Sequence, residues 1–304
     1  MIFTNTRLGN FAKDPAVVNF GGTYFLYYTV HYRTLGENKI GIGIAASADM
    51  EHWEDRGEIP MEQDCEKNGI GAPAAIVLDG AVHLFYQTYG NGRLDAICHA
   101  VSQDGEHFAK NPTNPVFRPA PTWCCGRAID ADVCMFGGEL LLYFATRDHE
   151  MKIQKVGAAA ASPDSGFVRD AWRELHIGAV MAPELVWEQQ CIEAPAVLVR
   201  GGSIYMFYAG AYNCAPQQIG CAVSEDGVRF ERLFLEPLLR HGPAGAWNAS
   251  ESGHPYIFED DDGRVYLFYQ GSPDGGKTWY LSRAEIGFDE AGVPFIKELF
   301  DAEG

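Results

Sequence analysis

The most regular feature of the chain is a short apolar run that ends in aromatic residues and occurs five times. It reads TYFLYYT, AVHLFYQ, ELLLYFA, SIYMFYA and RVYLFYQ. Branched and aromatic residues favour extended backbone, and the Gly and Asp residues beside these runs favour tight turns. The period indicates five copies of one unit, because the last aromatic residue recurs every 58 to 64 residues, at Tyr28, Tyr86, Phe144, Tyr208 and Tyr269.

Each copy contains further strand-like runs. PAVVNF, PAAIVL, ADVCMF, PAVLVR and PYIFED precede the aromatic run, and runs such as IGIGIAAS and IGCAVS follow it. Three or four antiparallel strands per unit, with no convincing amphipathic helix, are typical of a β-propeller blade. We therefore predict an all-β fold, a single five-bladed β-propeller over residues 1–304. A β-sandwich is the alternative, but it does not account for a fivefold period.

The amino-acid composition limits the kinds of molecule that the protein can bind. The 47% hydrophobic content is ample for a packed core, and 23 Lys and Arg residues against 41 Asp and Glu residues give a formal net charge of -18. This charge makes nucleic acid, anionic membrane surfaces and highly acidic polysaccharides poor partners. A small, neutral substrate fits better.

The beginning of the chain and its cysteines bear on location. MIFTNTRLGNFAKDP lacks the basic start, apolar run and cleavage site of a secretory signal, so we expect a cytoplasmic protein unless a signal peptide has been removed. The eight cysteines show no CxxC spacing. We expect reduced thiols packed in the core rather than a zinc site or disulfides.

Acidic residues recur at the head of the first strand of the unit. These heads read KDPAVV, GAPAAI, IDADVC, EAPAVL and GHPYIF. Asp14 and Asp130 stand at the same distance from their aromatic landmark, and Glu193 stands one residue further out. Ala72 and His254 occupy the corresponding places in copies two and five. The first strand of a propeller blade lines the central channel, so we expect the three acids at one structural position around one mouth.

The residue types in this cluster indicate a class of chemistry. Like charges buried together are unfavourable unless function or pairing retains them. The chain has no G-x-S-x-G elbow, no phosphate-binding G-x-x-x-x-G-K-[ST] loop and no His-rich metal cage. Glycoside hydrolysis requires two carboxyl groups beside an acetal carbon, one of which donates a proton while the other activates water or attacks.

The segments KDPAVV, RAIDADVCMF and CIEAPAVL resemble the motifs of glycoside hydrolase family 43. Members of that family are five-bladed propeller glycosidases that act mainly on glycans containing arabinose and xylose. The resemblance extends over essentially the whole chain through the repeats. It implies that Asp14 is the general base, that Asp130 tunes pKa and orientation, and that Glu193 is the general acid. A general base requires room for water, so we expect inversion and carboxyl groups roughly 6.5 to 9.5 Å apart.

The resemblance also implies roles for two residues of the fifth copy. His254, in ESGHPYIF, is similar to a family histidine that binds Ca²⁺ or another ion in the central channel. A core histidine with satisfied hydrogen bonds is the alternative. Arg283, in WYLSRAEI, resembles an arginine near the substrate in xylosidase-like members. Apart from this ion, no cofactor is expected.

Other substrate-binding candidates follow from the expected strand order, because the second strand returns to the face that carries the acids. Arg147, in TRDHEMK, is expected to bind a sugar hydroxyl or steer the acids, or else to pair with Asp148. Trp123 and Trp247 precede channel-lining strands. Each is expected to face a sugar ring or to pack between blades.

Three other functions stay open. The related family 32 invertases and fructanases use their first Asp as a nucleophile and retain configuration, although their usual Asn before Asp-Pro is Lys13 here. A glycoside phosphorylase would hold phosphate with basic side chains, for which Arg127 and Arg147 are candidates. A non-catalytic glycan-binding propeller would keep the aromatic residues and lose the acids.

Overall fold

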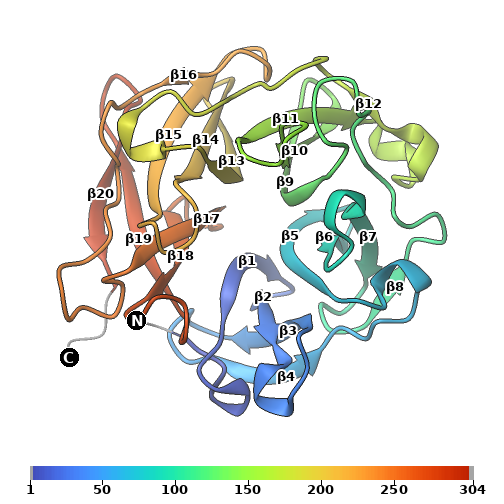
Figure 1. Cartoon of the computed structure of the whole chain (residues 1–304), viewed down its shortest axis with the longest axis horizontal. Helices are drawn as coiled ribbons and strands as arrows, with labels where there is room; N and C mark the ends of the chain where they lie inside the picture. The colour runs from blue at the N-terminus through green and yellow to red at the C-terminus, as the bar shows by residue number, and fades with distance from the viewer. Residues whose placement is uncertain (1–2, 301–304) are drawn as a thin grey trace.

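Five four-stranded antiparallel sheets make up the computed structural model, which describes residues 3–300. The sheets are arranged like blades around a central axis (Figure 1). In each blade the strands follow one another in chain order from the axis outward. The predicted five-bladed β-propeller is confirmed. Of the predicted span, residues 1–2 and 301–304 lie outside the described residues.

All blades share one plan, in which a long inner strand is followed by two middle strands and an outer strand of two to six residues. In chain order the strands are β1 (Lys13–Phe20), β2 (Thr23–His31), β3 (Ile40–Ser47), β4 (Glu54–Glu58), β5 (Ile70–Leu78), β6 (Ala81–Thr88), β7 (Ile97–Ser102), β8 (Phe108–Lys110), β9 (Ile129–Phe136), β10 (Glu139–Arg147), β11 (Gln154–Ala161), β12 (Arg173–Glu174), β13 (Ile192–Arg200), β14 (Ser203–Gly210), β15 (Gln218–Ser224), β16 (Glu231–Arg232), β17 (Glu251–Glu259), β18 (Val265–Ser272), β19 (Tyr280–Phe288) and β20 (Pro294–Leu299). Single turns of 3₁₀-helix lie in the connections, namely η1 (Thr6–Leu8), η2 (Tyr32–Leu35), η3 (Asp64–Glu66), η4 (Gly92–Leu94), η5 (Pro163–Ser165), η6 (Arg169–Ala171) and η7 (Val186–Glu188).

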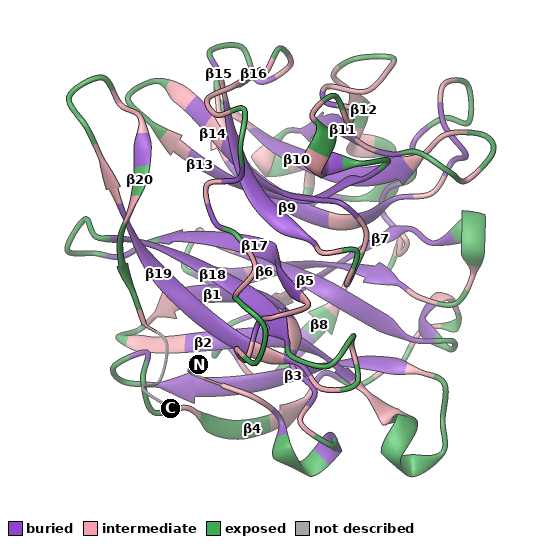
Figure 2. Cartoon of the chain, turned by 60° about the vertical axis from the view of Figure 1, so that its left-hand side comes forward, coloured by how far each residue is buried: buried purple, intermediate pink, exposed green. Residues whose placement is uncertain are grey.

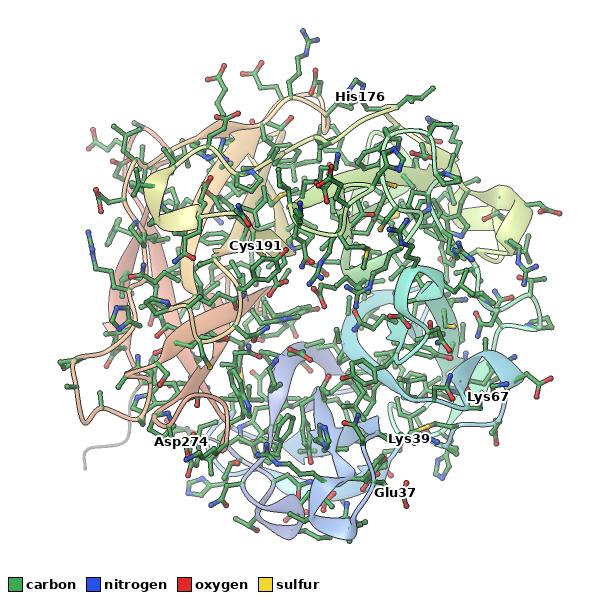
Figure 3. All side chains as sticks on the ribbon, viewed as in Figure 1. Glu37, Lys39, Lys67, His176, Cys191 and Asp274 are labelled. Carbon is green, nitrogen blue, oxygen red and sulfur yellow. The ribbon has the colours of Figure 1, made fainter. Side chains whose placement is uncertain are left out.

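The aromatic repeat forms the second strand of every blade and supplies the core. Its five landmark residues are at most 1% exposed: Tyr28, Tyr86, Phe144, Tyr208 and Tyr269. The inner and middle strands are largely buried, whereas exposed residues concentrate in the connections and outer strands (Figure 2). Figure 3 shows the same contrast, with His176 and Asp274 towards the outside and Cys191 nearer the axis. The repeat therefore marks the surfaces that pack between sheets.

The inner strands β1, β5, β9, β13 and β17 contact one another around the ring. The pairing of each inner strand with the second strand is interrupted near the head of the inner strand by a register shift. At this bulge one non-glycine residue adopts a left-handed φ between 42° and 51°: Asp14, Ala72, Asp130, Ala194 and His254. Such a conformation costs about 1 to 2 kcal/mol per residue, so the surrounding structure must hold it in place.

Side chains from the preceding blade hold four of these bulges. Each accepts a hydrogen bond from the backbone N–H of the left-handed residue, which would otherwise be buried without a partner. The four bonds run from Ala72 to Thr29 Oγ1 (2.8 Å), from Asp130 to Gln87 Oε1 (2.7 Å), from His254 to Gln217 Oε1 (3.1 Å) and from Asp14 to Gln270 Oε1 (3.0 Å). Neighbouring blades therefore fix the backbone of the candidate site directly.

The register corrects the expectation that three acids share one structural position. Asp14 and Asp130 share the left-handed position, but in blade four Ala194 occupies it. Glu193 pairs with Ala209 as Lys13 pairs with Thr29, so Glu193 is the structural counterpart of Lys13. Only two carboxylates share the position, and the third approaches from the preceding residue.

The N-terminal segment closes the ring against blade five. Phe3 and Leu281 exchange two backbone hydrogen bonds of 3.1 and 2.8 Å, and Trp279 N donates to Asn10 O at 2.8 Å.

All eight cysteines lie within the described residues and none forms a disulfide, as predicted. Within residues 3–300, no helix has the length and apolar character needed to cross a membrane.

Candidate active site

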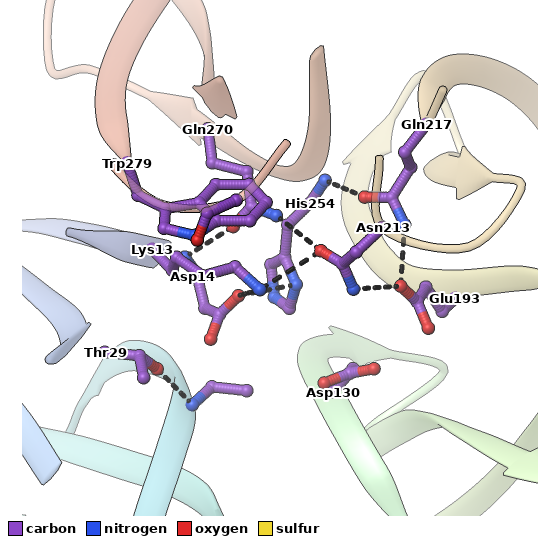
Figure 4. A network of polar contacts seen from close by, with 12 residues as sticks. Lys13, Asp14, Thr29, Asp130, Glu193, Asn213, Gln217, His254, Gln270 and Trp279 are labelled. Carbon is purple, nitrogen blue, oxygen red and sulfur yellow. Dashed lines mark hydrogen bonds and ion pairs between the residues drawn. The ribbon is translucent and has the colours of Figure 1, made fainter. Parts of the chain in front are cut away.

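A pocket of about 250 Å³ opens at the bulged end of the inner strands. Asp14, Asp130 and Glu193 all line it, although they come from three different blades. Figure 4 shows their carboxylates around one space, with His254 behind Asp14. Arg147 and His254, two further residues predicted from the sequence, also line the pocket. The remaining lining includes Lys13, Thr29, His31, Gln87, Tyr89, Arg127, Gln154, Tyr212 and Asn213.

Two basic side chains face the carboxylate of Asp14. His254 Nδ1 lies 3.0 Å from Asp14 Oδ1, and Lys13 Nζ lies 3.8 Å from the same oxygen. Burial opposes ionisation, yet the pKa of Asp14 is lowered because the charges of His254 and Lys13 outweigh it. A buried carboxylate with this environment is suited to accept a proton from water near neutral pH.

Glu193 has the opposite electrostatic environment. Its side chain is 5% exposed, and it accepts hydrogen bonds from Gln217 Nε2 at 2.6 Å and from Gln154 Nε2. Burial raises its pKa, and this effect outweighs the hydrogen bond from Gln217 and the charge of Lys13. A carboxyl group with a raised pKa keeps its proton longer and is suited to donate it to a leaving oxygen.

Asp130 is the third member of the cluster. Its backbone N–H donates to Gln87 Oε1 at 2.7 Å, which fixes the bulge that carries it. Burial and the like charge of Glu193 raise the pKa of Asp130 to about 7. Asp130 and Glu193 therefore influence each other's ionisation, so protons leave the pair in coupled steps.

Lys13 and Asn213 connect the two sides of the pocket. Lys13 Nζ donates to Asn213 Oδ1 at 3.1 Å, and Asn213 Nδ2 donates to Glu193 Oε1 at 3.4 Å (Figure 4). The ammonium group also stands 4.4 Å from the ring centroid of Trp279. Burial disfavours the charged form of Lys13. The negative charges of nearby acids, first Asp14 and then Glu251, outweigh burial, so the pKa of Lys13 is raised.

The sequence reasoning missed a further buried acid, Glu251, and the amides that support the site. Glu251 is fully buried and accepts hydrogen bonds from Gln270 Nε2 and Cys214 N, both at 2.6 Å. Gln270 and Gln87 end the aromatic runs RVYLFYQ and AVHLFYQ. Both glutamines directly follow the aromatic landmark of their blade, and this shared position could have identified them from the sequence. No comparable sequence pattern marks Glu251.

Three predicted substrate-binding residues do not line this pocket. Arg283 donates to Met50 O at 2.9 Å and stacks on Phe300, away from the acids. The Trp123 ring packs near Phe144 and donates to Glu174 Oε2 at 2.7 Å, and Trp247 packs near Tyr269. These contacts match the packing alternative for both tryptophans. The proposed function therefore gives Arg283, Trp123 and Trp247 no part in substrate binding.

The channel ion expected at His254 stays a prediction. The Nδ1 atom of His254 faces Asp14, and no group of three His, Cys, Asp or Glu side chains within residues 3–300 is spaced to hold a metal ion.

Arg147 does not form the alternative ion pair with Asp148. Instead, its Nε donates to Gln154 Oε1 at 2.6 Å.

Fold and site together define a glycosidase with paired carboxyl groups. The model of the family described as Glycosyl hydrolases family 43 matches residues 3–286, so the chain belongs to this family and is a glycoside hydrolase. Its substrate is accordingly a carbohydrate. The resemblance seen in the sequence motifs is confirmed.

Solved structures agree on the fold. A thermostable family-43 glycoside hydrolase has a TM-score of 0.75 at 19% identity, covering 99% of this chain and 98% of the other. The alpha-L-arabinofuranosidase from Lactobacillus brevis has a TM-score of 0.70 at 15% identity, covering 93% of both chains. The xylan beta-1,4-xylosidase from Bacillus Halodurans C-125 has a TM-score of 0.71 at 17% identity, covering 97% of this chain and 56% of that one.

A curated relative has a different activity. The Beta-1,2-mannobiose phosphorylase of Thermoanaerobacter sp. (strain X514) is 31% identical over 106 residues. The match covers 31% of this chain and about a third, 33%, of the relative.

Proposed function

We propose that this enzyme removes a neutral arabinofuranosyl or xylosyl group from short oligosaccharides with inversion of configuration. The observation that carries the proposal is the opposite perturbation of two carboxyl groups in one pocket. Asp14 has a lowered pKa beside His254 and Lys13, and buried Glu193 has a raised one. Environments that separate two pKa values in this way assign one group as base and the other as acid.

Each residue has a defined task in the proposed reaction. Asp14 removes a proton from water as the water attacks the anomeric carbon, and Glu193 protonates the departing oxygen. Asp130 acts on Glu193 through like charge, which keeps a proton within the pair until the leaving group takes it. The pentose preference rests on the family and on the arabinofuranosidase and xylosidase among its structural neighbours.

A panel of aryl glycosides tests this proposal. The enzyme should hydrolyse an arabinofuranoside or a xyloside at least tenfold faster than a galactoside or a fructoside. Asp14→Asn and Glu193→Gln should each reduce hydrolysis of the natural-type disaccharide by two or more orders of magnitude. Preferential cleavage of the fructoside would instead favour an invertase-type enzyme, and binding without turnover would favour a glycan-binding propeller.

Phosphorolysis is the second candidate, supported by the phosphorylase relative and by Arg127 and Arg147 in the pocket lining. Arg147 is connected to Glu193 through Gln154, so it lies on the side of the acid. An attacking phosphate would have to stand opposite the acid, beside the carboxylate of Asp14. Hydrolysis is therefore favoured, and cleavage at full rate in phosphate-free buffer is the expected result.

A further inference from the structure

Arg127, just before β9, and Arg147, the last residue of β10, come from neighbouring segments of blade three. Cys125 N donates to Arg147 O at 2.8 Å, so the segment before β9 that carries Arg127 runs beside the end of β10 that carries Arg147. Both arginines line the pocket that holds the carboxylates.

The ends of both guanidinium groups are uncommitted. Arg147 uses only Nε, toward Gln154, and its guanidinium carbon stands 5.0 Å from the ring centroid of Tyr212. Arg127 Nε lies 3.4 Å from Asp95 Oδ2, but this nitrogen is buried and has no hydrogen-bond acceptor among the described residues. The terminal nitrogens of both side chains have no protein partner within residues 3–300.

Two other basic side chains of the pocket face a carboxylate. Lys13 and His254 both face Asp14, at 3.8 and 3.0 Å. Arg127 is paired with Asp95, which lies outside the lining, and Arg147 has no ion pair among the described residues. A pair of planar guanidinium forks with free N–H groups matches the bidentate geometry of a carboxylate.

The position of the pair identifies the part of the substrate that it contacts. Gln154 accepts from Arg147 Nε and donates to Glu193 Oε2, so one side chain separates the arginine from the proposed general acid. The general acid stands beside the leaving oxygen. Arg147 therefore lies on the leaving-group side of the scissile bond, and Arg127 lines the same pocket.

We propose that Arg127 and Arg147 form a carboxylate-binding subsite, which takes a uronic acid residue on the leaving-group side of the cleaved sugar. This proposal rests on the proposed function and refines its substrate: a neutral pentosyl group linked to a uronate-containing oligosaccharide. The net charge of -18 disfavours long polyanions. It does not prevent a single carboxylate from binding to the terminal nitrogens of these two arginines, because charge interactions at contact distance are screened less than those across the surface.

Calorimetric titration of matched monosaccharides tests the subsite independently of turnover. D-Galacturonate and D-glucuronate should bind at least tenfold more tightly than D-galactose and D-glucose in phosphate-free buffer. Arg127→Met and Arg147→Met should each abolish this preference, whereas Arg240→Met, which removes an exposed arginine that pairs with Glu236, should preserve it. Arg147→Lys should weaken uronate binding less than Arg147→Met, because it keeps the charge and loses the fork.

Melting temperatures of all variants establish that each is folded, so a lost preference reports on the subsite. Equal binding of acidic and neutral sugars by the wild-type enzyme would overturn the proposal. So would formation of a sugar 1-phosphate in phosphate buffer, since the arginines would then serve inorganic phosphate. Because the readout is binding, absence of pentoside hydrolysis would refute the proposed function without affecting this result.

Discussion

His254 Nδ1 lies 3.0 Å from Asp14 Oδ1, and the two residues occupy the same left-handed bulge in adjacent blades. Blade five thus supplies a basic side chain at the position where blade one supplies the proposed base. The fold places them in contact because the inner strands β17 and β1 are neighbours in the ring. This pairing is the simplest explanation for an ionised carboxylate in a buried site.

Replacing this histidine should move the acidic limb of the pH profile. His254 lowers the pKa of Asp14. In His254→Gln the pKa of Asp14 should rise, so the base becomes protonated at higher pH and kcat/KM falls on the acid side first. Profiles of kcat/KM against pH for this variant and for the exposed control His52→Gln measure the effect. An unshifted acidic limb would show that His254 does not tune Asp14.

The role of Glu193 predicts a dependence on the leaving group. Glu193→Gln should lose about 10² to 10⁴ in rate on substrates with a basic leaving oxygen, because these need protonation. It should lose far less on aryl glycosides with acidic phenols, which depart without it. Glu184→Gln, at an exposed acid of the preceding loop, is the control. Equal losses on both kinds of substrate would remove Glu193 from the acid role.

The hydrogen bonds between blades predict a combined effect on stability and activity. Gln87→Ala leaves the backbone N–H of Asp130 without its acceptor, which should destabilise the fold by about 1 to 3 kcal/mol. The looser bulge should also reduce kcat/KM by roughly tenfold, since small displacements of reacting groups are costly. Denaturation and kinetics of this variant are compared with those of Gln103→Ala, an exposed glutamine. Wild-type values in both assays would contradict this role of Gln87.

A buried acid outside the active-site pocket predicts how stability changes with pH. Asp132 is 4% exposed on β9 and accepts a hydrogen bond from Val197 N at 2.7 Å. Burial raises its pKa to about 7. The unfolded chain releases this proton near pH 4. The folded state therefore binds an extra proton between about pH 4 and pH 7, and stability is lost as the pH rises through this window.

Asp132→Asn should flatten this loss while keeping an acceptor for Val197. Its melting temperature should exceed that of the wild type by several degrees at pH 7.5 and by little at pH 4.5. Asp164→Asn, at an exposed acid, should follow the wild type at both pH values. A parallel pH dependence for Asp132→Asn and the wild type would show that Asp132 does not titrate in this range.

The repeat carried most of what the sequence could predict. Aromatic landmarks such as Tyr28 and Tyr208 mark buried second strands, and this period fixed the number of blades and the common mouth for the acids. The register was harder to predict, because one bulge residue decides whether Asp14 aligns with Glu193 or with Ala194. Pro15 directly follows Asp14, and Pro195 directly follows Ala194. Alignment on these prolines pairs Asp14 with Ala194, whereas alignment on the aromatic residues did not.

Partners distant in sequence could not be predicted. Glu251 reaches Cys214 through loop geometry, and Arg283 points into the packing around Met50 rather than into the pocket. A motif resemblance gives a residue type and a blade, but side-chain direction depends on neighbours that carry no motif of their own.

The central claim, that Asp14 acts as a base on water, is tested most directly by the configuration of the first product. NMR spectra recorded within the first turnovers of an anomerically pure pentoside reveal the anomer released before mutarotation. The account predicts that the anomer opposite to that of the substrate appears first, because water attacks from the face opposite the leaving group. Initial release of the anomer that matches the substrate would contradict it and would indicate that Asp14 attacks the sugar directly.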